Sequence, residues 1–127
     1  MNERDTNIKP NPLKDKSFQF ALKIVNLFQF LSEQKKEYVI SKQLLRSGTS
    51  IGANVREAQN AQSKADFIHK FSIAQKECDE TLYWLELLHQ SGLLPEEEFT
   101  TIHKDANELL KMLRSSILTT KQNIHHS

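Results

Sequence analysis

One stretch of small and apolar residues, Arg46 to Ala58, constrains the fold more than any other part of the chain. At 100° per residue its apolar positions fall on one stripe with alternating gaps of four and three, the period of an amphipathic helix. The stripe consists of Leu44, Gly48, Ile51, Val55, Ala58 and Gln62. A glycine inside a helix costs about 1 kcal/mol relative to alanine. We therefore expect Gly48 and Gly52 to mark a close approach of a neighbouring helix.

A polar flank runs beside this stripe and is expected to pair with the helix that follows. The flank contains Ser47, Ser50, Asn54 and Glu57. The next helix is predicted to open at Ser63 and to stop at Gly92. It carries a second core stripe of Phe67, Phe71, Ala74, Cys78, Thr81, Leu85 and Leu88. If the two helices are antiparallel, facing residues have numbers that sum to about 127.

This register predicts three complementary pairs, which are Arg46 with Glu80, Ser50 with Glu77, and Glu57 with Lys70. We interpret the polar side chains as a seam that fixes how the two helices pack. The predicted polar seam consists of Arg46, Ser47, Ser50, Asn54, Glu57, Lys70, Glu77, Glu80 and Trp84. A functional site at the same residues is the alternative, because structural ion-pair networks gather carboxylates and cations in the same way.

Two further helices are predicted, one on each side of this pair. In the first, from about Asp15 to Lys36, apolar residues cover nearly half of the helical circumference, which is wider than one core requires. The wide arc indicates either a generously buried helix or a second surface for another subunit, with Leu27 and Phe30 as the candidate oligomer surface. Ser41 is the expected N-cap of the glycine-containing helix, which is predicted to run to about Gln62. The last helix starts at Pro95 and repeats the apolar period to Ile117.

Composition and loop lengths place these helices in one all-α domain. The chain has 127 residues but only 3 Gly and 3 Pro, which favours long helices joined by short turns. Short connections make consecutive helices antiparallel neighbours, so we predict an up-down-up-down four-helix bundle. The bundle is expected to span residues 15–121, between a flexible arm at 1–14 and a frayed tail at 122–127.

Charge and apolar content limit the partners and the compartment. With 17 Lys and Arg against 16 Asp and Glu, the formal charge of +1 gives no global attraction to nucleic acid or membrane. A local basic patch is the alternative to scattered lysines, with candidates Lys14, Lys16, Lys23, Lys35, Lys36 and Lys42. The chain lacks an apolar signal sequence and any apolar run near about 18 residues, so we expect a cytoplasmic protein without membrane contact.

No pattern of catalytic, cofactor-binding or metal-binding residues emerges, and we predict that the protein is not an enzyme. Di-iron bundles need two Glu-x-x-His motifs, whereas this chain has one, Glu86 to His89, away from the centre of its core stripe. Cys78 lies on a core stripe and is interpreted as a small buried hydrophobe rather than a nucleophile.

Two motifs resemble a known family. The runs RSGTSIGANVREA at Arg46 to Ala58 and DFIHKFSIAQKECDETLYWLELL at Asp66 to Leu88 are similar to those of the four-helix-bundle proteins of the 23S rRNA intervening-sequence family. The resemblance covers about Phe18 to Ile117 and implies a bundle that assembles as a ring, typically a pentamer. A related accessory protein of diversity-generating retroelements resembles the same fold and partners a reverse transcriptase and nucleic acid.

Two functional hypotheses follow from the residues and the resemblance. The first is a non-catalytic homo-oligomeric assembly or adaptor protein that presents a ring surface to a protein or RNA partner. The second is a direct nucleic-acid-binding accessory factor. The salt dependence of binding distinguishes them, because phosphate contacts make the affinity fall steeply with salt.

Overall fold

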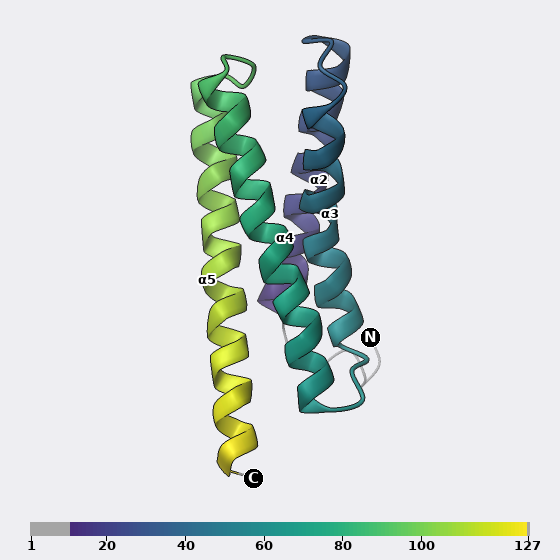
Figure 1. The fold of residues 1–127 in the computed structure, drawn as a ribbon, viewed down its shortest axis with the longest axis vertical. Helices are drawn as coiled ribbons and strands as arrows, with labels where there is room; N and C mark the ends of the chain where they lie inside the picture. Colours follow the sequence, from purple (N-terminus) through teal and green to yellow (C-terminus); the bar gives the residue numbers. More distant parts are fainter. Residues whose placement is uncertain (1–10, 127) are drawn as a thin grey trace, which may run out of the picture.

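The computed structural model describes residues 11–126, which form four α-helices and no strand (Figure 1). The helices are α2 (Pro12–Glu33), α3 (Ile40–Ala58), α4 (Lys64–Gln90) and α5 (Glu96–His126). The prediction of an all-α fold with four helices is confirmed for these residues. Residues 1–10, most of the predicted arm, lie outside the described part of the chain.

The first described helix begins earlier than predicted. The side chain of Asn11 accepts a hydrogen bond from the backbone N–H of Lys14 at 3.0 Å, and Pro12 occupies the first turn. Asparagine at the N-cap followed by proline is a strong helix start, since proline has no N–H to leave unsatisfied. The predicted start at Asp15 is therefore wrong by three residues, and residues 12–14 belong to the helix rather than to an arm.

Glu37, and not Ser41, caps α3. Its carboxylate accepts hydrogen bonds from the backbone N–H groups of Val39, Ile40 and Ser41 at 3.0, 2.8 and 2.7 Å. Burial raises the pKa of Glu37, but the backbone donors Ile40, Ser41 and Val39 outweigh it and lower the pKa below its ordinary value. Ser41 is buried in the first turn, where its hydroxyl donates to the Glu37 carbonyl at 2.8 Å.

The other helix ends differ from the predictions at two places. α3 ends at Ala58 instead of Gln62, because the next three N–H groups bond to carbonyls three residues back and turn the chain. α5 continues to His126, so the predicted fraying of the tail is wrong for residues 122–126. No Gly or Pro follows Pro95, and extending an existing helix adds one hydrogen bond for each residue fixed.

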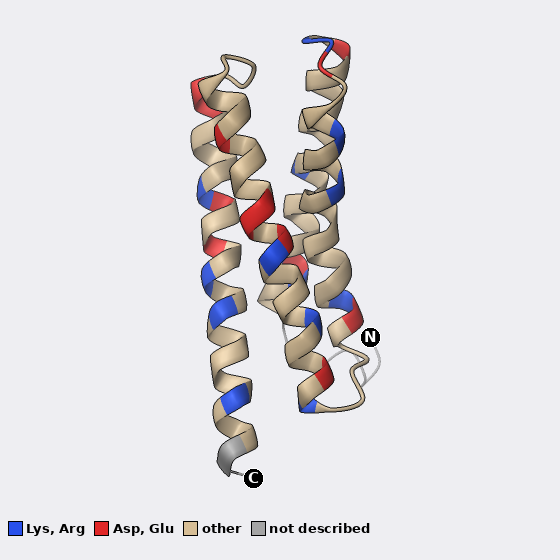
Figure 2. Cartoon of the chain, in the orientation of Figure 1, with Lys and Arg blue, Asp and Glu red and all other residues tan. Residues whose placement is uncertain are grey.

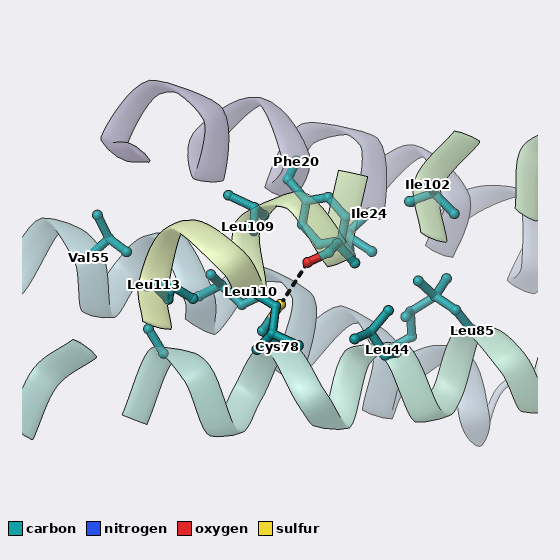
Figure 3. Packing of buried hydrophobic residues seen from close by; sticks show 14 of the residues in the cluster. Phe20, Ile24, Leu44, Val55, Cys78, Leu85, Ile102, Leu109, Leu110 and Leu113 are labelled. Carbon is teal, nitrogen blue, oxygen red and sulfur yellow. Dashed lines mark hydrogen bonds between the residues drawn. The ribbon is translucent and has the colours of Figure 1, made fainter. Parts of the chain in front are cut away.

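Each helix packs against two others among the described residues, and the core fills the space between all four. α3 lies between α2 and α4, α4 lies between α3 and α5, and α2 contacts α5 on the remaining side. α2 and α4 consequently lie diagonally across the bundle from each other. The predicted core stripe of α4 is buried apart from Phe67, which packs on the edge of the core. Figure 3 shows Cys78 among the buried aliphatic residues, where its Sγ donates to the Ala106 carbonyl at 3.2 Å.

The two glycines of α3 lie where α2 comes closest, as the sequence predicts. A Cβ at Gly48 would stand 2.7 Å from a side-chain carbon of Ile24, which is fully buried. A Cβ at Gly52 would stand 3.2 Å from the backbone oxygen of Ser17. The later glycine, Gly52, lies against the earlier α2 residue, Ser17, while Gly48 lies against Ile24. α2 and α3 therefore run in opposite directions. The absence of two side chains thus sets the separation of these helices.

We expect Gly48→Ala to destabilise the protein, although alanine is the better helix former by about 1 kcal/mol. The added methyl group overlaps the Ile24 side chain inside a packed core, and overpacking costs typically about 1–3 kcal/mol. Chemical denaturation gives the free energy of unfolding. Gly52→Ala is the matched variant and should be milder, whereas Gly52→Leu should destabilise. A Gly48→Ala protein that is more stable than the parent would contradict the close-packing argument.

Candidate functional site

The predicted polar seam forms between α3 and α4. The guanidinium of Arg46 contacts Glu77 at 3.1 Å and also donates to Glu80. At the other end of the seam the Lys70 ammonium lies 3.0 Å from a carboxylate oxygen of Glu57. Two of the three predicted pairs, Arg46 with Glu80 and Glu57 with Lys70, are therefore present. Their order along the two helices shows that α3 and α4 are antiparallel.

The predicted contact between Ser50 and Glu77 is wrong. The Ser50 hydroxyl donates to the carbonyl of Arg46 at 2.6 Å, one turn back in its own helix, and Asn54 donates to the carbonyl of Ser50 at 2.9 Å. Arg46 reaches Glu77 in its place because a guanidinium can bind two carboxylates at once, whereas a serine hydroxyl is too short to compete. Trp84 completes the cluster by donating its indole N–H to Glu80 at 3.3 Å.

A buried hydroxyl pair lies beneath the seam. The hydroxyl oxygens of Ser47 and Thr81 are 2.9 Å apart, and both side chains are fully buried. Thr81 also bonds with the carbonyl of Glu77 at 2.7 Å. The sequence contains a signal for this contact, since Ser47 and Thr81 also fit the antiparallel register and Thr81 is a polar member of an apolar stripe.

The electrostatics of the seam support a structural role. The Arg46 side chain is 49% exposed, while the side chains of Glu77 and Glu80 are 14% and 29% exposed. The hydrogen bond from Arg46 lowers the pKa of Glu80 despite the opposing effect of burial. No buried side-chain polar atom in the described residues lacks a hydrogen-bond partner. The seam therefore leaves no buried donor or acceptor for a substrate.

We expect Arg46→Ala to lower the free energy of unfolding by less than about 1 kcal/mol, because half-exposed ion pairs are screened by water. Since the pKa of Glu80 is lowered in the folded state, its contribution is present above about pH 4.3, the ordinary glutamate value. It is lost as the pH falls through the folded-state pKa. A double-mutant cycle with Arg46→Ala and Glu80→Gln, measured at neutral and acid pH, tests this expectation. Zero coupling at neutral pH would contradict the pairing, and a loss well above about 1 kcal/mol for Arg46→Ala would contradict the screening argument.

The candidate oligomer surface at Leu27 and Phe30 is placed differently from the prediction. Leu27 is only 8% exposed and belongs to the core, so the expectation that it faces a second subunit is wrong. Phe30 packs against the core beneath the Lys35 ammonium, which lies 5.8 Å from its ring. Together with Ile102 these two residues line a groove of about 520 Å³ between α2 and α5.

The exposed apolar surface of α2 is a different row of residues, Phe18, Leu22 and Val25, which we call the α2 stripe. Their exposed fractions are 46%, 46% and 36%. Spacings of four and three place them along one outward line of the helix. The guanidinium of Arg56 on α3 lies 5.5 Å from the centre of the Phe18 ring. The sequence correctly indicates an apolar arc on this helix that is wider than the core covers. The exposed edge of the arc lies at the α2 stripe and not at Leu27 and Phe30.

The six lysines of the candidate basic patch do not form one surface. Lys16 bonds with Glu108, and Lys23 lies 2.6 Å from Asp105, so α5 carboxylates neutralise both. Lys14 and Lys35 are separated by roughly 30 Å along α2 at 1.5 Å per residue. Lys36 and Lys42 lie near Lys35, in the turn and at the start of α3. The prediction of a single basic patch is therefore wrong.

A basic row that the sequence reasoning missed lies on α5. Its members are exposed, share one outward side at spacings of seven, three and seven, and form no ion pair within the described residues. This α5 basic stripe consists of Lys104, Lys111, Arg114 and Lys121. Figure 2 shows acidic residues at the start of α5 and basic residues over its second half. The signal was present, since residues 109–126 contain Lys and Arg but no Asp or Glu.

His89, which belongs to the single Glu-x-x-His motif, and the nearby His103 bind two different carboxylates. His103 bonds with Glu86 at 3.2 Å, and His89 bonds with Glu96 instead. The ring of Phe99 lies between them, with ring centres at 4.0 Å from His89 and 4.8 Å from His103. Within the described residues no three potential ligands are grouped for a metal ion.

The remaining candidate group is Cys78, which is fully buried. Burial raises the pKa of its thiol to about 12, so the thiolate required of a nucleophile is scarce at neutral pH. The interpretation of Cys78 as a small buried hydrophobe is confirmed. None of the helices within residues 11–126 has the length and apolar content that crossing a bilayer requires.

Comparisons with known proteins agree with the two motifs found in the sequence. The family model described as 23S rRNA-intervening sequence protein matches residues 11–115. A crystal structure of a protein with unknown function from the S23 ribosomal protein family of Bacteroides thetaiotaomicron is 56% identical, with a TM-score of 0.82 over 83% of this chain and 97% of that chain. No curated protein matches. The chain belongs to the 23S rRNA-intervening sequence protein family.

Proposed function

We propose that the protein is a non-catalytic assembly or adaptor protein of the cytoplasm. In this proposal the up-down-up-down bundle is the subunit of a ring-like homo-oligomer, a pentamer, whose surface receives a protein or RNA partner. The pentamer rests on the resemblance of the two motifs to the family. The absence of a catalytic role is also a proposal, supported by the satisfied polar groups of the seam and the buried Cys78.

The α2 stripe is the observation that carries this proposal. Three large apolar side chains in a row, each more than one-third exposed, leave apolar area in water along about two turns in the middle of α2. Contiguous exposed apolar surface on a folded protein commonly marks an interaction site. Burying such a row removes apolar area from water at roughly 25 cal/mol per Å², which favours association.

Static light scattering after size exclusion tests the assembly. At micromolar concentration we expect a mass of about five subunits of 14.7 kDa each. The mass should stay the same on dilution within the micromolar range. It should also stay the same at high salt, since an apolar interface depends little on ionic strength. A mass of one subunit would overturn the proposal. Any other closed oligomer would retain the adaptor role and correct the subunit number.

Direct nucleic-acid binding is the second candidate, and the α5 basic stripe is the observation that favours it. Its outer members, Lys104 and Lys121, are 17 residues apart, or roughly 26 Å along the helix. Exposed cations on one side of a helix that form no ion pair within the described residues can contact a run of phosphates. Such contacts release counterions, so each contributes about 0.7–0.9 to the slope of log affinity against log salt.

The salt dependence of RNA binding tests this second candidate. We expect the paired change Lys111→Ala and Arg114→Ala to weaken binding and to reduce the salt slope by roughly 1.5. Lys36→Ala with Lys42→Ala is the matched control, because it removes two exposed lysines elsewhere and should leave the slope unchanged. Fluorescence anisotropy with labelled single-stranded RNA gives both quantities. Equal slopes for the two double variants would contradict a role for the α5 basic stripe.

A further inference from the structure

The α2 stripe has a counterpart on α4. Tyr83 and Leu87 are exposed large hydrophobics that follow one another by one turn, and Asp79 precedes Tyr83 by one turn. Tyr83 is 59% exposed and its ring packs edge-on against Trp84, with ring centres 4.9 Å apart. We call the surface of Asp79, Tyr83 and Leu87 the α4 face.

The α2 stripe and the α4 face lie at opposite corners of the bundle. α2 and α4 are the diagonal pair, and both contact α3 and α5 but not each other within the described residues. A closed ring uses two different patches on each subunit, one for each neighbour. Two patches on opposite corners meet this requirement, whereas a single self-complementary patch would produce a dimer.

The two surfaces also lie at the same level along the bundle. Ile24 of α2 lies against Gly48 of α3, and Ser47, the residue before Gly48, bonds with Thr81 of α4. Ile24 and Thr81 are therefore level, and the exposed Val25 and Tyr83 follow them by one and two residues. α2 and α4 both run opposite to α3, so they are parallel. Cyclic symmetry rotates a subunit without moving it along the ring axis. In a ring whose bundles stand along that axis, patches that meet must therefore be level to within about one turn.

The charges beside the two surfaces are opposite. Beside the α2 stripe, Lys14 is exposed and Arg56 lies against the Phe18 ring, whereas Lys16 and Lys23 are already paired with α5 carboxylates. Of the four carboxylates in residues 77–86 of α4, Glu77 and Glu80 pair with Arg46 and Glu86 pairs with His103, which leaves Asp79 on the α4 face. Asp79, Lys14 and Arg56 are exposed and form no ion pair within the described residues. Opposite charges around an apolar centre favour docking between unlike patches and oppose docking between like ones.

From placement, level and charge we infer that the α2 stripe of one copy packs on the α4 face of the next, so that each subunit uses both surfaces in the ring. The occupant of the α2 stripe is thus a second copy of this chain. This inference rests on the proposed homo-oligomer and adds which two surfaces meet. Each copy contacts one neighbour through its α2 stripe and the other neighbour through its α4 face. The same contact therefore repeats around the ring.

Complementation between two assembly-defective variants tests the inference. Leu22→Glu disables the α2 stripe and Tyr83→Glu disables the α4 face, and each variant alone should fall to the mass of one subunit. Each still carries one intact surface of the complementary kind. An equimolar mixture should therefore form a species of two subunits, one of each variant. Leu118→Glu on α5 is the matched control, because it also places a carboxylate at an exposed leucine and should assemble as the parent does.

The outcomes separate the inference from the proposed function. A parent protein with the mass of one subunit would remove the oligomer and the inference with it. If the parent assembles and either glutamate variant assembles equally well, the surface changed in that variant is not part of the contact. Two single-subunit variants that do not associate on mixing would overturn the pairing of unlike surfaces. Circular dichroism verifies that each variant is folded, and Leu22→Ser with Tyr83→Ser are the milder variants to use if helicity is lost.

Discussion

The approach of α2 onto α3 at Gly48 and Gly52 is the constraint on which the rest of the structure depends. With hydrogen atoms in place of side chains at these two positions, Ile24 and Ser17 reach the backbone of α3. Ser17 fits there only because it is small, and its hydroxyl is satisfied by the Lys14 carbonyl at 3.0 Å. Since interiors are packed to the density of organic crystals, this contact fixes both the spacing and the axial position of α2.

α3 uses its other side to fix α4. There the polar seam, together with the buried hydroxyls of Ser47 and Thr81, allows only one axial position, since a shift by one turn of about 5.4 Å would separate these groups. Each hydroxyl also bonds to a carbonyl of its own helix, Thr81 to Glu77 and Ser47 to Leu44, so both stay satisfied within the core. The hydroxyl pair and the ion pairs therefore specify the same register together.

The sequence was most informative where contacts are local or join consecutive helices. The core stripes, the Ser63 cap and the pairing of Arg46 with Glu80 follow from helical period and a short turn. Contacts between α2 and α5 could not be obtained in this way, because the first and last helices have no turn that sets their register. The ion pairs of Lys16 and Lys23 with α5 were therefore missed, and two neutralised lysines were assigned to a basic patch.

The same reason explains why the apolar arc of α2 was recognised while its exposed edge was misplaced. A helical period gives the width of an apolar arc, but the direction of the core is set by the neighbours. α5 covers Leu27, whereas the residues that the structure describes leave Leu22 46% exposed. Because α3 fixes α2 through its glycines and α4 through its hydroxyl pair, it also fixes the relative level of the two outward surfaces. The level of Leu22 relative to Tyr83 is thus a property of α3, which contributes neither residue. A change inside the core of α3 can consequently alter a surface that lies two helices away.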